Sequence, residues 1–198
     1  LREFYKERLG IDYDKIEVNP HISPDIKYGV EIEEVNVADE SHGKNLCNDK
    51  FTCKHEYTIS NVNKESDKEE SPYVGIVRSG EFISDILSAT SEEDLQAVYD
   101  MVNTLNKYGA TTNSTCGMHI HVSDSVTISN QDTVSKRIRK QFVDMQSLIL
   151  KKLCVYETRL AKTATPLYGY GGEAYNRYKA LNTMSILKHG SVEFRLFN

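Results

Sequence analysis

Three short segments of the chain each carry two charged or metal-binding side chains separated by one apolar residue. They are Glu31-Ile-Glu33, His119-Ile-His121 and Glu193-Phe-Arg195. Since residues i and i+2 of a β-strand point to the same face, each pair is predicted to lie on a polar face while its apolar neighbours turn to a core. An ordinary surface strand alternates with Lys, Thr and Ser, whereas these three present Glu, His and Arg. The repeated pattern predicts a functional site on one face of a sheet.

The residue types of this site indicate metal-dependent phosphate chemistry. Carboxylates from Glu31, Glu33 and Glu193 are hard oxygen donors that suit Mg²⁺ or Mn²⁺, and carboxylates crowded on one face need cations beside them. A histidine ligand shifts the preference toward Mn²⁺ or Zn²⁺ without excluding Mg²⁺. Arg195 would place a guanidinium where a polyphosphate or a phosphoryl transition state carries charge. The alternative for Arg195 is a structural salt bridge to Glu193 or Glu33.

Other catalytic motifs are missing from the sequence. It contains no G-x-x-x-x-G-K-[ST] loop, no G-x-G-x-x-G turn after a strand and no serine in a nucleophile elbow. Cys47, Cys53 and His55 form a C-x5-C-x-H run that matches no usual zinc spacing, so ordinary thiols are expected there. Cys116 and Cys154 are predicted to be small buried residues.

Composition predicts one soluble globular domain. The chain has 198 residues, of which 39% are hydrophobic and 27% charged, and this length is enough to bury a core. The net charge of -5 argues against nucleic acid as a partner. No apolar run approaches the roughly 20 residues that span a membrane, and no leader peptide is visible, so a cytoplasmic location is expected. The oligomeric state is left open.

The expected domain organisation is uneven along the chain. An N-terminal extension over 1–27 precedes a catalytic domain over 28–198, in which Tyr28–Val37 is the first strand. The charged stretch at about 38–71 is predicted to be an insertion or mobile hairpin, with His55–Val62 as a candidate strand. Tyr73–Val77 is expected to return as a short strand. Because the sequence stops at Asn198 directly after a strand-like run, truncation of the domain at its C-terminus is part of this expectation.

Helical periodicity appears in three places. Ser91 is predicted to cap a helix that Gly109 closes. A long helix over about Thr133–Glu157 and a third over about Glu173–Met184 are expected to follow. The buried stripe of the long helix is predicted at Ile138, Phe142, Met145, Ile149 and Tyr156, and its solvated face at Lys136, Arg137, Arg139, Lys140, Lys151 and Lys152. The uneven order of strands and helices favours an α+β fold with a mostly antiparallel sheet.

Five motifs together resemble one family of enzymes. In order they are Gly29-Val-Glu31-Ile-Glu33, Glu81-Phe-Ile-Ser84, Cys116-Gly-Met-His119-Ile-His121, Arg177-Tyr-Lys-Ala-Leu-Asn182 and Glu193-Phe-Arg195. This series is similar to the pattern of the amidoligase family, a branch of the carboxylate–amine ligases related to glutamine synthetase. The chain departs from the pattern at Asp85, where the family usually has proline. The resemblance spans about Tyr28 to Asn198.

The resemblance implies a glutamine synthetase-like fold, in which a curved, mostly antiparallel sheet holds divalent ions and ATP. The residues it implies as metal ligands are Glu31, Glu33, Glu81, His119 and Glu193. It implies that His121 and Arg195 face the nucleotide phosphates and that Arg177 meets phosphate or the substrate carboxylate, with Arg195, Glu193 and Arg177 as the catalytic set.

The implied reaction is ATP-dependent ligation of a carboxylate and an amine, using Mg²⁺ or Mn²⁺. The substrates are expected to be small molecules or peptides, and the sequence names neither of them. Two alternatives stay open. One is a zinc hydrolase that uses the His-x-His strand, and the other is a degenerate nucleotide-binding module.

Overall fold

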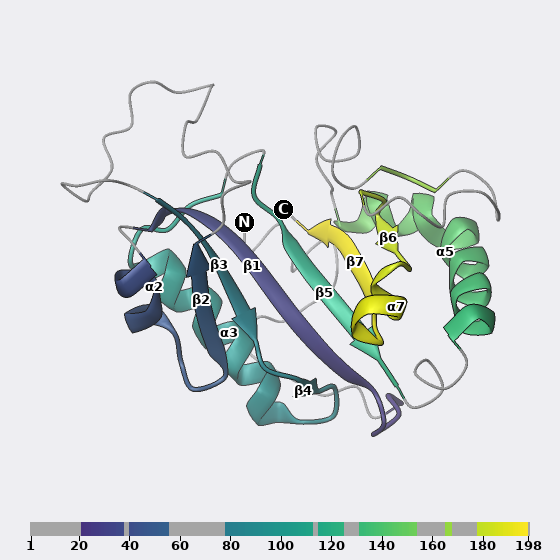
Figure 1. The fold of residues 1–198 in the computed structure, drawn as a ribbon, viewed down its shortest axis with the longest axis horizontal. Helices are drawn as coiled ribbons and strands as arrows, with labels where there is room; N and C mark the ends of the chain where they lie inside the picture. Colours follow the sequence, from purple (N-terminus) through teal and green to yellow (C-terminus); the bar gives the residue numbers. More distant parts are fainter. Residues whose placement is uncertain are drawn as a thin grey trace.

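The computed structural model describes residues 21–37, 40–55, 78–112, 115–124, 131–153, 165–167 and 178–197. Its framework is one seven-stranded sheet with the order β2-β3-β1-β5-β7-β6, in which β4 also pairs with β1 (Figure 1). The strands are β1 (Lys27–Val37), β2 (Phe51–His55), β3 (Arg78–Ser84), β4 (Leu87–Ser88), β5 (Met118–Ser123), β6 (Leu181–Asn182) and β7 (Val192–Phe197). Neighbouring strands all pair antiparallel. The α+β class with a curved, mostly antiparallel sheet is therefore confirmed.

The two faces of the sheet differ in chemistry because each strand alternates. On one face Val30 and Ile32 of β1 pack with Phe82 of β3. On the opposite face the odd-numbered residues of β1 point away from this core. The polar face is therefore the one that carries Glu31 and Glu33, as the spacing predicts.

One core cluster fills the space between β2, β3, β1 and two helices. These helices are α2 (Glu40–Leu46) and α3 (Glu92–Lys107), and α3 lies behind the sheet in Figure 1. Met101 and Leu105 of α3 are completely buried there. The Ser91 side chain accepts a hydrogen bond from the Asp94 backbone N–H at 3.1 Å and so caps α3 as predicted. This packing fixes β1 and β3 from behind.

A second cluster supports the other half of the sheet. Phe142 of α5 (Gln131–Leu153) packs with Leu181 of β6 and Val192 of β7. The short helix α7 (Ser185–His189) joins β6 to β7 and adds Ile186 to this cluster. Gly190 ends α7 in the left-handed region at φ 67°, a conformation that glycine adopts without steric cost. The chain thereby turns tightly back into β7.

The prediction of a helix over Glu173–Met184 is wrong for its described part, 178–184. Leu181 and Asn182 form β6 and pair with Phe194 and Glu193 of β7. The Ala180 carbonyl accepts a hydrogen bond from the Arg195 backbone N–H at 3.0 Å. Pairing with β7 therefore outweighs the local helical pattern in this segment.

Strand boundaries also differ from those predicted. Residues 40–55, which lie within the predicted charged insertion, form α2 and β2, and Leu46, Phe51 and Cys53 join the core. The candidate strand at His55–Val62 lies outside the described residues except for His55, where β2 ends. The predicted strand at Tyr73–Val77 lies outside the described residues, as do the segments 1–20 and 56–77, while β3 begins at Arg78.

Two details of the long helix contradict its predicted faces. Met145 was expected in the buried stripe but is 53% exposed, whereas Arg139 was expected on the solvated face but is only 7% exposed. Phe142 is buried and Ile138 and Ile149 pack against the core, as predicted. Cys116 is buried as expected, and Cys154 and Tyr156 lie outside the described residues. Among the helices that the structure describes, none has the length and apolar character needed to cross a bilayer.

Candidate active site

The register of three central strands places the predicted pairs beside one another. Glu31 of β1 lies opposite His119 of β5, and His121 of β5 lies opposite Glu193 of β7. Directly opposed residues in an antiparallel pair share a face. The Glu-x-Glu, His-x-His and Glu-x-Arg segments therefore meet on the polar face of the sheet, although they come from distant parts of the chain.

His119 lies at the centre of the cluster and is 3% exposed. Its Nδ1 atom lies 3.2 Å from Glu31 Oε2, 3.6 Å from Glu193 Oε1 and 3.4 Å from an Arg195 guanidinium nitrogen. Its Nε2 atom is buried without a hydrogen-bond partner. Burial lowers the pKa of His119, and the nearby guanidinium adds to this effect against the opposing hydrogen bond from Glu31. The ring is therefore neutral near pH 7, and a Nδ1–H that donates to Glu31 leaves a bare lone pair on Nε2.

His121 is held by two serine hydroxyls on one side and by Glu31 on the other. Its Nδ1 atom lies 3.0 Å from Ser191 Oγ and 3.2 Å from Ser185 Oγ, and the two hydroxyls are 3.3 Å apart. Its Nε2 atom lies 3.4 Å from Glu31 Oε1. The ring of His189 stands edge-on to it, with 6.0 Å between centroids. Because hydroxyls both donate and accept, the serines can support either tautomer while fixing the ring.

Glu193 and Arg195 form a buried ion pair with an amide beside it. The Arg195 guanidinium donates to Glu193 Oε1, and Asn182 Nδ2 donates to Glu193 Oε2 at 2.6 Å. All three side chains are at most about a tenth exposed. The salt bridge that was the structural alternative for Arg195 is therefore present. It occupies one carboxylate oxygen and leaves the guanidinium within the cluster.

The two neighbouring histidines control the pKa of Glu31. Burial by itself would raise the pKa of Glu31, but hydrogen bonds and charge from His119 and His121 outweigh it and hold the pKa well below its usual range. Glu34, which directly follows Glu33 on β1, points to the packed face. Burial raises its pKa to about 7. The polar face thus stabilises an ionised carboxylate, whereas the packed face favours a neutral one.

Three residues of the cluster have the geometry of a metal site. One ligand atom each from Glu31, His121 and Glu193 lies within 4.8 Å of the other two. Two of these, Glu31 and Glu193, belong to the predicted ligand set, whereas His121 was predicted to contact phosphate. Glu33 and Glu81, also predicted as ligands, lie opposite each other on β1 and β3. They form a neighbouring acidic pair outside this trio.

The donor atoms of the trio fit a divalent cation. Two carboxylates and one imidazole match Mn²⁺ or Mg²⁺, and Zn²⁺ is also compatible. His121 Nε2 is buried without a hydrogen-bond partner, and the ligand oxygens of Glu31 and Glu193 lie within 4.8 Å of each other. A cation in the trio would satisfy both features. The predicted catalytic Arg177 lies outside the described residues.

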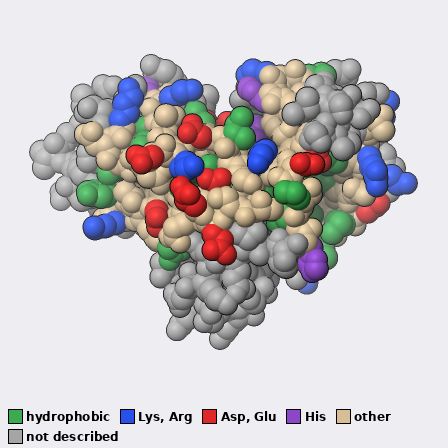
Figure 2. All heavy atoms as spheres, turned by 90° about the horizontal axis from the view of Figure 1, so that it is seen from below, with side chains coloured by type: hydrophobic (Ala, Val, Ile, Leu, Met, Phe, Trp, Pro, Cys, Tyr) green, Lys and Arg blue, Asp and Glu red, His purple; other side chains and the backbone are tan. Residues whose placement is uncertain are grey.

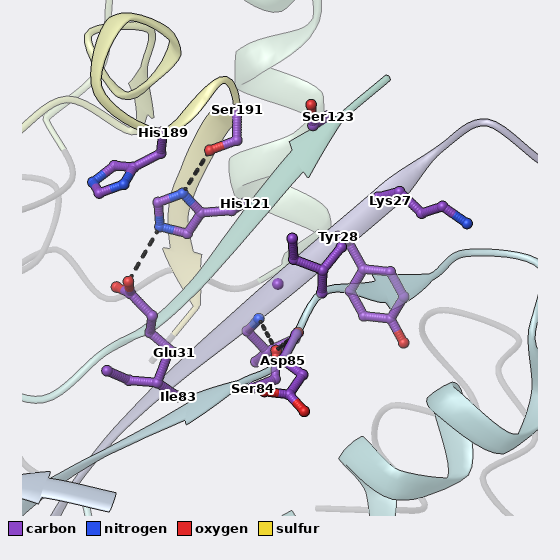
Figure 3. Close-up of a pocket in the computed structure, with 13 residues that line it drawn as sticks. Lys27, Tyr28, Glu31, Ile83, Ser84, Asp85, His121, Ser123, His189 and Ser191 are labelled. Atoms are coloured by element: carbon purple, nitrogen blue, oxygen red, sulfur yellow. Dashed lines mark hydrogen bonds and ion pairs between the residues drawn. The ribbon is translucent and has the colours of Figure 1, made fainter. Parts of the chain in front are cut away.

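A pocket of about 420 Å³ opens beside the trio, along the N-terminal half of β1. Glu31 and His121 lie together at one end of it (Figure 3), and Gly29 lines it near Ser84 and His121. The turn around Asp85 borders one side, and the α7–β7 turn with Ser191 borders the other. In Figure 2 the surface is hollowed between two raised parts at the top of the view, with histidine side chains on one wall. The size suits a small organic substrate.

Three polar residues of the site were not predicted from the sequence. Asn182 was recognised only within a motif, while Ser185 and Ser191 were not identified at all. Serines in a turn have no distinctive spacing, so no sequence signal marks them. For Asn182 the available signal was its place at the end of the R-Y-x-A-L-N motif.

Comparison with known proteins adds one finding. A family model described as "Putative amidoligase enzyme" matches residues 52–170, more than half of the chain. The matched segment contains Glu81, His119 and His121, while β1 and β7 lie outside it and pair directly with β5. No match was found among curated proteins.

Proposed function

The chain belongs to the amidoligase family, and from this premise we propose that it is an ATP-dependent ligase that joins a carboxylate to an amine with the help of Mg²⁺ or Mn²⁺. The observation that carries the proposal is the convergence of Glu31, Glu193, both histidines and Arg195 on one sheet face. Carboxylates for a cation and a guanidinium for phosphate, within one cluster, are the parts that nucleotide-dependent chemistry needs.

The fold supports this proposal. A curved antiparallel sheet with one open polar face and helices packed behind it is compatible with the catalytic sheet of a glutamine synthetase-like enzyme. We assign this catalytic role to residues 28–198. In this arrangement β1, β5 and β7 supply the site, and α3 and α5 support it from the packed face.

Glu31, His121 and Glu193 would hold the divalent ion, and Glu33 and Glu81 are the candidates for ligands of a second one. The chemistry that the ion supplies when bound is neutralisation of the crowded carboxylate and phosphate oxygens. His119 then acts through its position. Its Nδ1 atom orients Glu31 at 3.2 Å, and its Nε2 atom is buried without a hydrogen-bond partner.

The proposed reaction has two steps. A carboxylate oxygen of the first substrate attacks the γ-phosphorus of ATP, which forms an acyl phosphate and releases ADP. The amine nitrogen then attacks the acyl carbon and loses a proton, and inorganic phosphate leaves as the amide forms. Arg195, already fixed against Glu193, would stabilise charge on the transferring phosphoryl group, and Arg177 would bind phosphate or the substrate carboxylate.

Calorimetry of ATP binding tests this proposal. ATP is titrated with and without Mn²⁺ into the wild type, the Glu193→Gln variant and the control Glu92→Gln, which alters an exposed acid at the start of α3. We expect metal-dependent binding in the wild type and control, and a loss of at least about ten-fold in Glu193→Gln. Equal binding in all three proteins, or none in the wild type, would contradict the proposal.

A zinc hydrolase would not need ATP, so it predicts different results. Since the trio also suits zinc, that function predicts zinc retained through purification and turnover of a substrate without ATP. A degenerate module predicts folding and partner binding without any metal-dependent product.

A further inference from the structure

Gly29 lines the pocket, although neither its backbone conformation nor the packing around it requires a glycine. Gly29 has no positive φ, and a Cβ atom at this position would lie 3.8 Å from Ser84 Oγ and 4.0 Å from His121 Cβ. Both distances are ordinary van der Waals contacts. Neither backbone conformation nor packing therefore excludes alanine, and because Gly29 lines the pocket, a side chain at this position would occupy space beside Ser84 and His121.

Two isoleucines line the same pocket as Gly29. Ile83 lines the pocket from β3, and Ile86 lines it from the turn before β4. Ile86 is 83% exposed, the highest value among the large apolar side chains that the structure describes as exposed. A ligand with a hydrocarbon segment would cover this side chain, whereas a bare phosphate group would gain nothing from it.

One end of the pocket reaches the proposed metal site. Glu31 and His121 line the pocket and also belong to the candidate trio. Glu31 Oε2 lies 3.2 Å from His119 Nδ1, and Glu31 Oε1 lies 3.4 Å from His121 Nε2. A divalent ion held here by Glu31 and His121 would attract a carboxylate and repel an ammonium group. Asp85 stands at the mouth and is exposed, so solvent screens its charge.

From these features we propose that the pocket above Gly29 binds the acyl-donor substrate, a carboxylic acid whose unbranched aliphatic segment crosses Gly29 between Ile83 and His121. This inference rests on the proposed function, because the carboxylate end is placed at the proposed metal site. The absence of a side chain at Gly29 determines how wide the substrate's aliphatic segment can be. Ile86 covers the outer part of that segment.

The probe for this proposal is hexanoate, titrated in the presence of Mg²⁺ and followed by saturation-transfer NMR. We expect Gly29→Ala to weaken binding about four-fold, the equivalent of one displaced methylene, and Gly29→Val to weaken it further. Butyrate should bind more weakly than hexanoate for the same reason. Hexylamine, the matched amine, should show no dependence on residue 29.

A pair of exposed apolar residues provides the control. Ile86→Ser should weaken hexanoate binding several-fold, whereas Leu187→Ser should leave it unchanged, because Leu187 is 72% exposed but does not line the pocket. Melting temperatures of the Gly29 variants at or above that of the wild type would show that the strand is intact, since alanine and valine suit a strand better than glycine.

Three results would overturn the proposal. These are absence of hexanoate binding to the wild type, equal binding to the wild type and both Gly29 variants, and a residue-29 dependence seen with hexylamine instead. The outcome is separable from that of the proposed function. Metal-dependent ATP binding with hexanoate insensitive to Gly29 refutes the pocket assignment alone. Gly29-dependent hexanoate binding without ATP binding refutes the ligase alone.

Discussion

Removal of the Arg195 guanidinium should unbalance the buried charges of the site. In the native cluster Glu193 has the guanidinium on one oxygen and the Asn182 amide on the other, and it is 6% exposed. In Arg195→Met the carboxylate stays buried and keeps only Asn182 and a distant contact to His119 at 3.6 Å. Breaking a buried ion pair from one side costs about 3–5 kcal/mol. Because the Asn182 hydrogen bond remains, we expect a loss near the lower end of that range.

A double-mutant cycle separates this effect from lost packing. Urea unfolding in EDTA is measured for the wild type, Arg195→Met, Glu193→Gln and the double variant. If charge imbalance dominates, the double variant should be more stable than the sum of the single losses predicts, by about 1–3 kcal/mol. The control Arg137→Met changes an exposed arginine of α5 and should alter stability by less than about 0.5 kcal/mol.

The same experiment can refute the electrostatic account. A loss below about 1 kcal/mol for Arg195→Met would mean that the pair contributes no more than an exposed salt bridge. Additive losses in the double variant would show that Arg195 and Glu193 act independently. Either result would require a different explanation for the charge arrangement on this face.

Three further outcomes are expected. Glu34 has a folded-state pKa raised from 4.5 to about 7 by burial, so the stability it contributes is fully present below about pH 4.5 and is lost as the pH rises through 7. Urea midpoints should therefore fall between pH 5 and pH 8 in the wild type but less in Glu34→Gln, and parallel curves would contradict this. Ser91→Ala should destabilise the protein by about 1 kcal/mol through loss of the α3 cap, as measured by thermal unfolding, whereas Ser91→Asp should retain most of the stability. Ser191→Ala should weaken Mn²⁺ binding about ten-fold in calorimetry because His121 loses its support, and Ser191→Thr should restore it. Unchanged Mn²⁺ affinity in Ser191→Ala would show that Ser191 does not support His121 for metal binding.

The polar face was predictable because period-two alternation is local. Glu31 and Glu33 need only the strand conformation of β1 to share a face, and the same holds for each other pair. Local alternation does not determine the register between strands, which depends on which strands pair with each other. That His119 lies opposite Glu31, and Glu193 opposite His121, follows only from the order of strands in the sheet. The combination of His121 with two glutamates was therefore missed.

The segment around Asn182 shows why other elements were misjudged. Its neighbours have acceptable helix propensity, and propensity alone favours a helix there. Burial of Leu181 and hydrogen bonding with β7 outweigh that preference. Arg139 illustrates the same point on α5, because the charged side chain suggested solvent but its position on the helix faces the packed side.

The separation of the strands in sequence has a consequence for how the protein acquires its site. Glu31 and His119 are 88 residues apart, and His119 and Arg195 are 76 residues apart. Such non-local contacts raise contact order and make closure of the sheet slow compared with formation of α3 or α5. During synthesis β1 and β5 can pair before β7 has emerged, which leaves His119 and Glu31 without the guanidinium and Glu193. Ligand affinity should therefore develop late in folding, only once β7 has docked against β5.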